Sequence, residues 1–147
     1  MNRRYYCMFI VLFFAVLTQA AAAERTFNIL FIQSYTSQTP WHSDLNQGLA
    51  KGVKESGLKV NITTEYLDAD FWAFNSEKVI MRRFCQRARD RQTDLIVTAS
   101  DEAFYTLFAC GDSLPLQIPV VFFGIKYPDM ELIATHPNVC GFTANPD

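Results

Sequence analysis

Three short polar segments in this chain carry side chains that could contact a small molecule. Each segment follows an apolar run with the texture of a buried strand. Together they offer hydroxyl groups, a carboxylate, an ammonium group and exposed backbone beside aromatic rings, a set that suits ligand binding better than bond-making chemistry. The candidate ligand-binding residues are Ser34, Tyr35, Trp41, Ser100, Asp101, Gly124, Ile125 and Lys126.

Several of these residues also have a purely structural interpretation. Ser100 or Asp101 is an expected N-cap for the helix that begins there, and capping is favoured over ligand contact. Trp41 could be a hydrophobic staple for the first helix or a stacking surface, and the sequence favours neither. Tyr35 lies between polar loop residues, where an aromatic ring has little structural use, so a ligand role is favoured. Lys126 precedes a Tyr-Pro-Asp turn signal and is either a ligand contact or solvated.

The elements that position these residues alternate between strand and helix patterns. Apolar or alternating runs predict strands at 27–32, 59–67, 95–99, 119–123 and 139–143. Helical periodicity predicts helices at 42–56, 75–89 and 101–110, and a short one at 130–135. This alternation is typical of a parallel sheet with helices on both faces.

The texture of the strands predicts their order. Fully apolar strands belong in the middle of a parallel sheet, whereas the alternating stretch at 59–67 suits an edge. We therefore expect an α/β fold with a doubly wound, parallel five-stranded sheet in the order 2-1-3-4-5. The carboxyl ends of its central strands converge on one crevice, which would bring the candidate residues together.

The first residues have the pattern of a secretory signal peptide. Arg3 and Arg4 precede an apolar run from Tyr5 to Leu17, and Ala20 to Ala23 provide small residues for a signal peptidase. Cleavage would leave residues 24–147 as one domain, long enough for a single small core. The expected location is periplasmic or extracytoplasmic, with tethering to the membrane in a longer protein as an open possibility. An uncut membrane anchor is the alternative.

Composition and missing motifs argue against several function classes. A balance of 15 acidic to 13 basic residues gives no footprint for nucleic acid. The sequence has only two histidines and no H-E-x-x-H or C-x-x-C motif, which argues against a metal site. It also has no P-loop and no G-x-S-x-G elbow, so these motifs give no support for a bound cofactor or an enzyme. Cleavage would remove Cys7 and leave three of the four cysteines, Cys85, Cys110 and Cys140. We expect all three to be free, with Cys85 and Cys140 as buried small hydrophobes.

Five segments, taken in order, resemble a known family. They are ILFIQSYTSQTPWHSDLNQGL, EYLDAD, TDLIVTASDEAFYTL, IPVVFFGIKYPDMEL and HPNVCGFTANPD. They are similar to the extracytoplasmic "ABC transporter substrate-binding protein-like" domain, which has the type 1 periplasmic-binding-protein fold. The resemblance covers essentially all of residues 24–147. It implies the N-terminal lobe of a two-lobed domain that closes on a ligand by hinge motion, with the second lobe absent from this chain.

The resemblance also implies a site and a role. It places ligand contacts at the same eight residues, matches Asp101 and Glu102 to an acidic pair, and puts Lys126 where the family usually has a short polar residue. The expected ligand is a small, amino-acid-like or aromatic molecule, and no catalysis is expected. The leading hypothesis is the sensory input lobe of a membrane signalling protein such as a histidine kinase.

Two other functions stay open from the sequence. One is the first lobe of an ABC importer's solute-binding protein, and the other, of a different class, is a secreted flavodoxin-like enzyme. The partner would be a membrane signalling module or an ABC permease. A homodimer in which two lobes complete each other's site is a further arrangement.

Overall fold

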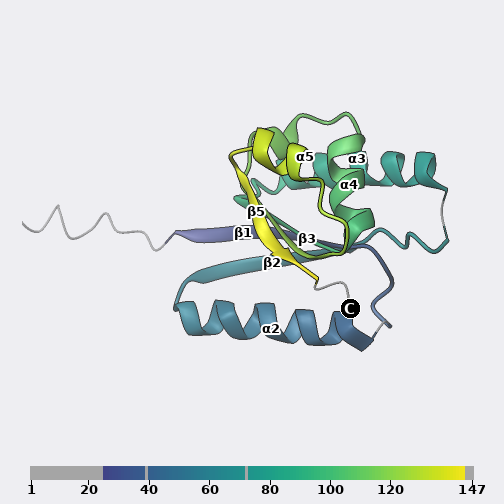
Figure 1. Cartoon of the computed structure of the whole chain (residues 1–147). Coiled ribbons are helices and arrows are strands. Elements are labelled where there is room, and N and C mark those ends of the chain that lie inside the picture. The colour runs from purple at the N-terminus through teal and green to yellow at the C-terminus, as the bar shows by residue number, and fades with distance from the viewer. Residues whose placement is uncertain (1–24, 39, 72, 145–147) are drawn as a thin grey trace, which may run out of the picture.

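The computed structural model describes residues 25–38, 40–71 and 73–144, so the expected signal segment at 1–23 lies outside the described residues. Strands and helices alternate along the whole described chain (Figure 1). They are β1 (Thr26–Gln33), α2 (Pro40–Ser56), β2 (Lys59–Tyr66), α3 (Phe74–Asp90), β3 (Leu95–Ala99), α4 (Asp101–Ala109), β4 (Val120–Ile125), α5 (Met130–Thr135) and β5 (Val139–Thr143). All the predicted elements are present, and a 3₁₀ turn at Leu114–Leu116 was not predicted.

The five strands form one parallel sheet in the order β2-β1-β3-β4-β5, which confirms the predicted order. The interior strand β1 pairs with β2 on one side and with β3 on the other. The last five residues of β1 are all buried, because helices cover both faces of the sheet there. A strand buried on both faces needs apolar side chains at every position, which is why β1 reads as a continuous apolar run.

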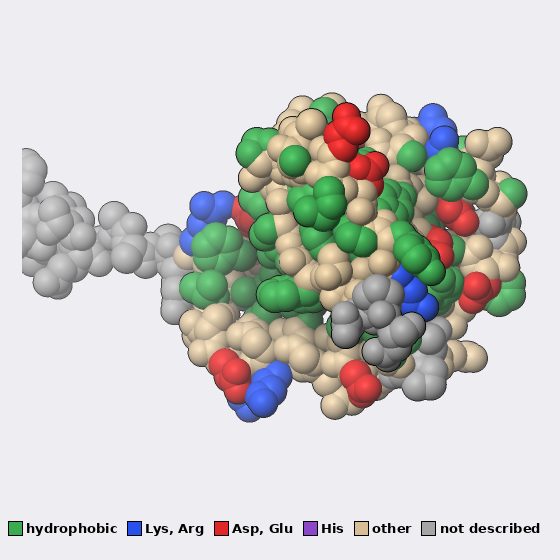
Figure 2. All heavy atoms as spheres, in the orientation of Figure 1, with side chains coloured by type: hydrophobic (Ala, Val, Ile, Leu, Met, Phe, Trp, Pro, Cys, Tyr) green, Lys and Arg blue, Asp and Glu red, His purple; other side chains and the backbone are tan. Residues whose placement is uncertain are grey.

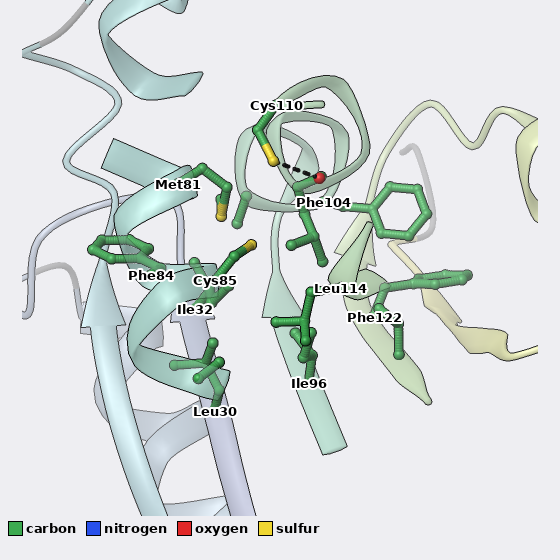
Figure 3. Packing of buried hydrophobic residues seen from close by; sticks show 14 of the residues in the cluster. Leu30, Ile32, Met81, Phe84, Cys85, Ile96, Phe104, Cys110, Leu114 and Phe122 are labelled. Carbon is green, nitrogen blue, oxygen red and sulfur yellow. Dashed lines mark hydrogen bonds between the residues drawn. The ribbon is translucent and has the colours of Figure 1, made fainter. Parts of the chain in front are cut away.

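The main core lies between the sheet and the helices α3, α4 and α5. Helix α3 directs an apolar stripe at the sheet, in which Met81, Phe84 and Ala88 follow at helical spacing. Helix α4 contributes Phe104 and Leu107 to the same cluster. Figure 3 shows these helices side by side above the strands, with their side chains interleaved.

The opposite face of the sheet is covered by α2 (Figure 1). Leu45 and Leu49 of α2 pack against this face. An apolar hollow of about 450 Å³ lies between α2 and the sheet, and Figure 2 shows hydrophobic side chains along this seam. On the strands beyond it, the rings of Phe123 and Phe142 stack, and Phe142 is exposed.

The cysteines are free, as expected, but their burial differs from the prediction. Cys85 and Cys110 are buried, whereas Cys140 is exposed. Cys140 lies on β5, where every residue after Val139 is exposed. The expectation that Cys140 is a buried hydrophobe is therefore wrong, because apolar neighbours in sequence do not cover an edge strand.

Candidate functional site

Ser34 follows β1 and joins three elements beneath the carboxyl edge of the sheet. Its side chain is completely buried. The hydroxyl donates to the carbonyl of Ala99, at 2.8 Å, and accepts the backbone N–H of Ala103, at 2.9 Å. That N–H belongs to the first turn of α4, where backbone donors have no partner within the helix. Ser34 therefore caps α4 from a neighbouring strand.

Ser100 occupies the N-cap position of α4 without capping it. Its backbone has φ +74° and ψ 170°, and its side chain makes no cap hydrogen bond. The expected side-chain cap from Ser100 or Asp101 is therefore wrong, since the bond is supplied by Ser34. A positive φ is uncommon for a residue other than glycine, and such strained positions gather at functional sites.

Asp101 begins α4 and holds the loop that follows β4. Its carboxylate accepts the backbone N–H groups of Lys126, at 3.1 Å, and Tyr127, at 3.3 Å. One helical turn later, the Tyr105 hydroxyl donates to the Tyr127 carbonyl and accepts the Asp129 N–H. Two side chains of α4 thus fix the loop at residues 126–129.

Trp41 lies in the first turn of α2 and packs against the end of β4. The backbone of Gly124 has φ +70°, and a Cβ atom built on it would lie 3.2 Å from Cη2 of the Trp41 ring. A staple residue precedes its helix, so the staple interpretation of Trp41 is wrong, because this residue is inside α2. The ring is 37% exposed, which leaves part of its surface available for stacking.

Tyr35 and Glu102 form a polar pair next to Trp41. Burial of Tyr35, a hydrogen bond to the Glu102 carboxylate, and the negative charges of Glu102, Asp70 and Asp101 all raise the pKa of the Tyr35 hydroxyl well above its ordinary value. Its proton is therefore held at neutral pH. The Oε2 atom of Glu102 is buried and has no hydrogen-bond partner among the described residues.

These residues surround a hollow of about 560 Å³ at the carboxyl edge of the sheet. It is lined by Tyr35, Trp41, Ser100, Asp101, Glu102, Tyr105, Gly124, Lys126, Tyr127 and Ala144. Four aromatic rings face two carboxylates and one ammonium group. The ionisable side chains of the lining thus carry more negative than positive charge. A pocket with apolar walls and a few polar groups is the usual form of a small-molecule site.

The structure brings together six of the eight predicted residues. The other two lie elsewhere: Ser34 is beneath the hollow, and Ile125 is fully buried in the main core. The eight predicted ligand residues did not include Glu102, Tyr105, Tyr127 or Ala144, which also line the hollow. Tyr105 could have been found from its spacing, because it lies four residues after Asp101 on the same helix face.

Two further properties concern the described parts of the chain only. Within the ranges 25–38, 40–71 and 73–144, no group of three or more His, Cys, Asp or Glu side chains could hold a metal ion. No helix in those ranges is long and apolar enough to cross a membrane.

Three solved structures share this fold. An ABC domain in complex with L-Trp from Streptococcus pneumonia is 20% identical, with a TM-score of 0.60, over 81% of this chain and 39% of its own. A substrate-binding protein with adhesive properties from Clostridium difficile, in its ligand-free open form, is 16% identical, with a TM-score of 0.57. The match covers 78% of this chain and 38% of that protein. A conserved domain protein from Vibrio cholerae is 17% identical, with a TM-score of 0.62. The match covers 81% of this chain and 39% of that protein.

These likenesses show the fold: the chain has the architecture of a single lobe of a periplasmic-binding-protein-like domain. It spans about 39% of the length of the first of these structures. No protein-family model matches the sequence, and no curated protein does.

Proposed function

We propose that this chain recognises a small molecule outside the cytoplasmic membrane, as the N-terminal lobe of the sensory input domain of a membrane signalling protein such as a histidine kinase. The observation that carries the proposal is the aromatic hollow at the carboxyl edge of the sheet. Its position is where ligands bind in open α/β sheets. The shared fold with substrate-binding proteins supports a binding role over a catalytic one.

The charges around the hollow favour an aromatic ligand that carries an ammonium group. Asp101 and Glu102 both line the hollow, whereas Lys126 is its one basic side chain. The Ala103 N–H in the first turn of α4 is already taken by Ser34, so this end of the helix offers less to an anion than a free helix start would. An aromatic amino acid would place its ring on Trp41, its ammonium group near Glu102 and its carboxylate near Lys126.

A panel of three indole probes tests this ligand class. L-tryptophan carries both charged groups, tryptamine only the ammonium group, and indole-3-propionate only the carboxylate. We expect saturation-transfer NMR on the purified chain to detect the first two at millimolar concentration, because one lobe contacts a ligand from one side only. Preferential binding of indole-3-propionate, or binding of none of the three, would contradict the proposed ligand class.

Two aromatic substitutions separate ligand contact from stability. Trp41→Ala and Tyr35→Ala should abolish saturation transfer to L-tryptophan while the melting temperature stays nearly unchanged, because both rings are partly exposed. Phe71→Ala is the matched control, since Phe71 is an exposed aromatic residue that does not line the hollow. A large loss of stability in Trp41→Ala with unchanged binding would assign that ring to packing alone.

The alternative function is the first lobe of an ABC importer's solute-binding protein, which the likeness to a substrate-binding protein also supports. An immunoblot of fractionated native cells, with an antibody raised against residues 24–147, distinguishes the two. A much larger band in the membrane fraction supports the sensor. A soluble band of about twice the mass of this chain supports the importer receptor, since such a receptor would contain this lobe and a second lobe of similar size. A band at the mass of this chain would contradict both.

A further inference from the structure

Two buried thiols lie together in the main core, outside the hollow described above. Cys85 is on α3 and is 0% exposed, and Cys110 is at the end of α4 and is 5% exposed. Both side chains belong to the same buried cluster. Figure 3 shows the Cys85 sulfur directed toward α4, and the Cys110 sulfur joined by a hydrogen bond to a carbonyl of its own helix. The Cys110 thiol also lies 3.1 Å from the Leu107 carbonyl, to which it donates.

An ion pair next to the thiols holds the two helix ends together. The Arg89 guanidinium binds the Asp112 carboxylate through two nitrogens, one of them at 3.0 Å. Arg89 lies one helical turn after Cys85, and Asp112 lies two residues after Cys110. Paired contacts of this kind have a defined geometry, so the segments that carry the two sulfurs are held at a fixed separation.

The third cysteine is in a different environment. Cys140 is exposed on the edge strand β5, and Cys85 and Cys110 are in the main core. In the sequence, the odd number of cysteines after residue 23 argued against pairing. In the fold, two of these three are buried in one cluster and the third is exposed. The pairing follows from the fold and has no signature in the spacing of the cysteines.

The two thiols differ in how readily each loses its proton. The neighbouring Cys85 thiol and the Asp112 backbone N–H favour the thiolate of Cys110 and lower the pKa of that thiol. The interaction with the Cys110 thiol, together with burial, raises the pKa of Cys85. A thiolate is the nucleophile in thiol–disulfide exchange, so Cys110 is the sulfur that reacts first.

We propose that Cys85 and Cys110 are a disulfide-forming pair, which a disulfide oxidant such as oxidised glutathione converts into a covalent link between α3 and α4. In the first step, the Cys110 thiolate attacks one sulfur of glutathione disulfide. A mixed disulfide forms, the glutathione S–S bond breaks, and one glutathione leaves with the proton that Cys110 lost. In the second step, deprotonated Cys85 attacks the Cys110 sulfur, and the second glutathione leaves with the Cys85 proton. Two protein thiols are oxidised and one glutathione disulfide is reduced to two thiols.

Peptide mapping of the full chain tests the link directly. The protein is purified reduced, equilibrated with an excess of oxidised over reduced glutathione, quenched in acid, unfolded and alkylated. Trypsin cleaves after Arg83, Arg87, Arg91 and Lys126, so each cysteine falls on its own peptide. We expect residues 84–87 joined to residues 92–126, with the peptide from residue 127 onward alkylated or carrying glutathione.

A stability measurement adds a second readout. Closing the loop between the two cysteines should raise the melting temperature by about 10 °C, from the entropy removed from the unfolded chain. Cys140→Ser should show the same cross-link and the same rise, whereas Cys85→Ser should show neither. If Cys85→Ser does not fold, the peptide map of the unaltered chain still decides.

Three results would overturn the inference. One is alkylation of Cys85, Cys110 and Cys140 alike after treatment with excess oxidant. Another is a cross-link that includes Cys140. The last is glutathione retained on Cys110 without any link to Cys85, which would show that the two sulfurs do not meet.

Discussion

Removing the Ser34 hydroxyl should destabilise the fold, although Ser34 looked like a ligand residue in the sequence. Ser34→Ala deletes the bond to the Ala99 carbonyl and the bond that the Ala103 N–H makes to Ser34. The carbonyl keeps the Ser34 backbone N–H, at 3.2 Å, as a partner. The Ala103 N–H is left buried without an acceptor.

The expected loss follows from these contacts. Leaving a buried donor unsatisfied costs about 1–3 kcal/mol, and loss of an N-cap costs typically about 1 kcal/mol. Because the two descriptions concern the same bond, we expect a total of about 2 kcal/mol rather than their sum. For a domain of this size that lowers the melting temperature by roughly 8 °C.

Thermal and urea unfolding, followed by far-ultraviolet circular dichroism, measure the effect. The matched control is Ser100→Ala, since Ser100 is also a buried serine at a strand end but makes no cap hydrogen bond. We expect the control to lose less than about 0.5 kcal/mol. Equal losses in the two variants would refute the capping argument. Unchanged stability of Ser34→Ala with lost binding of L-tryptophan would return Ser34 to the ligand site.

Three further predictions concern the hollow. Gly124→Ala should cost about 1 kcal/mol more in thermal unfolding than Gly111→Ala, because both have positive φ but only the first added methyl meets Trp41; equal costs would exclude the contact. Asp101→Ala should speed amide hydrogen exchange at the first two residues after β4 by about tenfold, since each loses its acceptor. Unchanged exchange would show that the Asp101 carboxylate does not hold this loop. Because the folded-state pKa of Tyr35 is raised, its contribution to stability is present below about pH 10 and is lost as the pH rises above that value. An absorbance titration should show one late tyrosine that Tyr35→Phe removes, and titration of every tyrosine near pH 10 would show the pair is not formed.

The architecture was predictable because burial on two faces leaves a mark on composition. β1 and β3 have few polar positions, and β2 alternates, so central and edge strands could be told apart. The predicted ends differ from the observed ones by at most two residues, as for Phe27–Ile32 against Thr26–Gln33. The 3₁₀ turn at Leu114–Leu116 was missed because a Leu-Pro-Leu sequence has no periodicity to detect.

The position of the hollow was predictable from the sequence, but its detailed lining was not. Strand ends identify which residues reach the crevice, and this principle placed Tyr35 and Asp101 correctly beside the hollow. The same principle does not predict how deeply each side chain is buried. Ser34 and Tyr35 are adjacent in sequence, yet the Ser34 side chain is fully buried and the Tyr35 side chain lines the hollow. The Tyr127 ring was missed because its place depends on the loop that Asp101 and Tyr105 hold.

The interior position of β1 has a consequence for the order in which the protein can assemble during synthesis. β1 is the first strand to leave the ribosome, yet it needs partners on both sides, and the second of them, β3, ends only at Ala99. Until then, an apolar strand with an open edge is exposed to other chains, a situation that promotes aggregation. Pairing partners so distant in sequence also slow folding. A nascent chain arrested before β3 should therefore depend on a chaperone, whereas one extended past α4 can close the centre of its sheet.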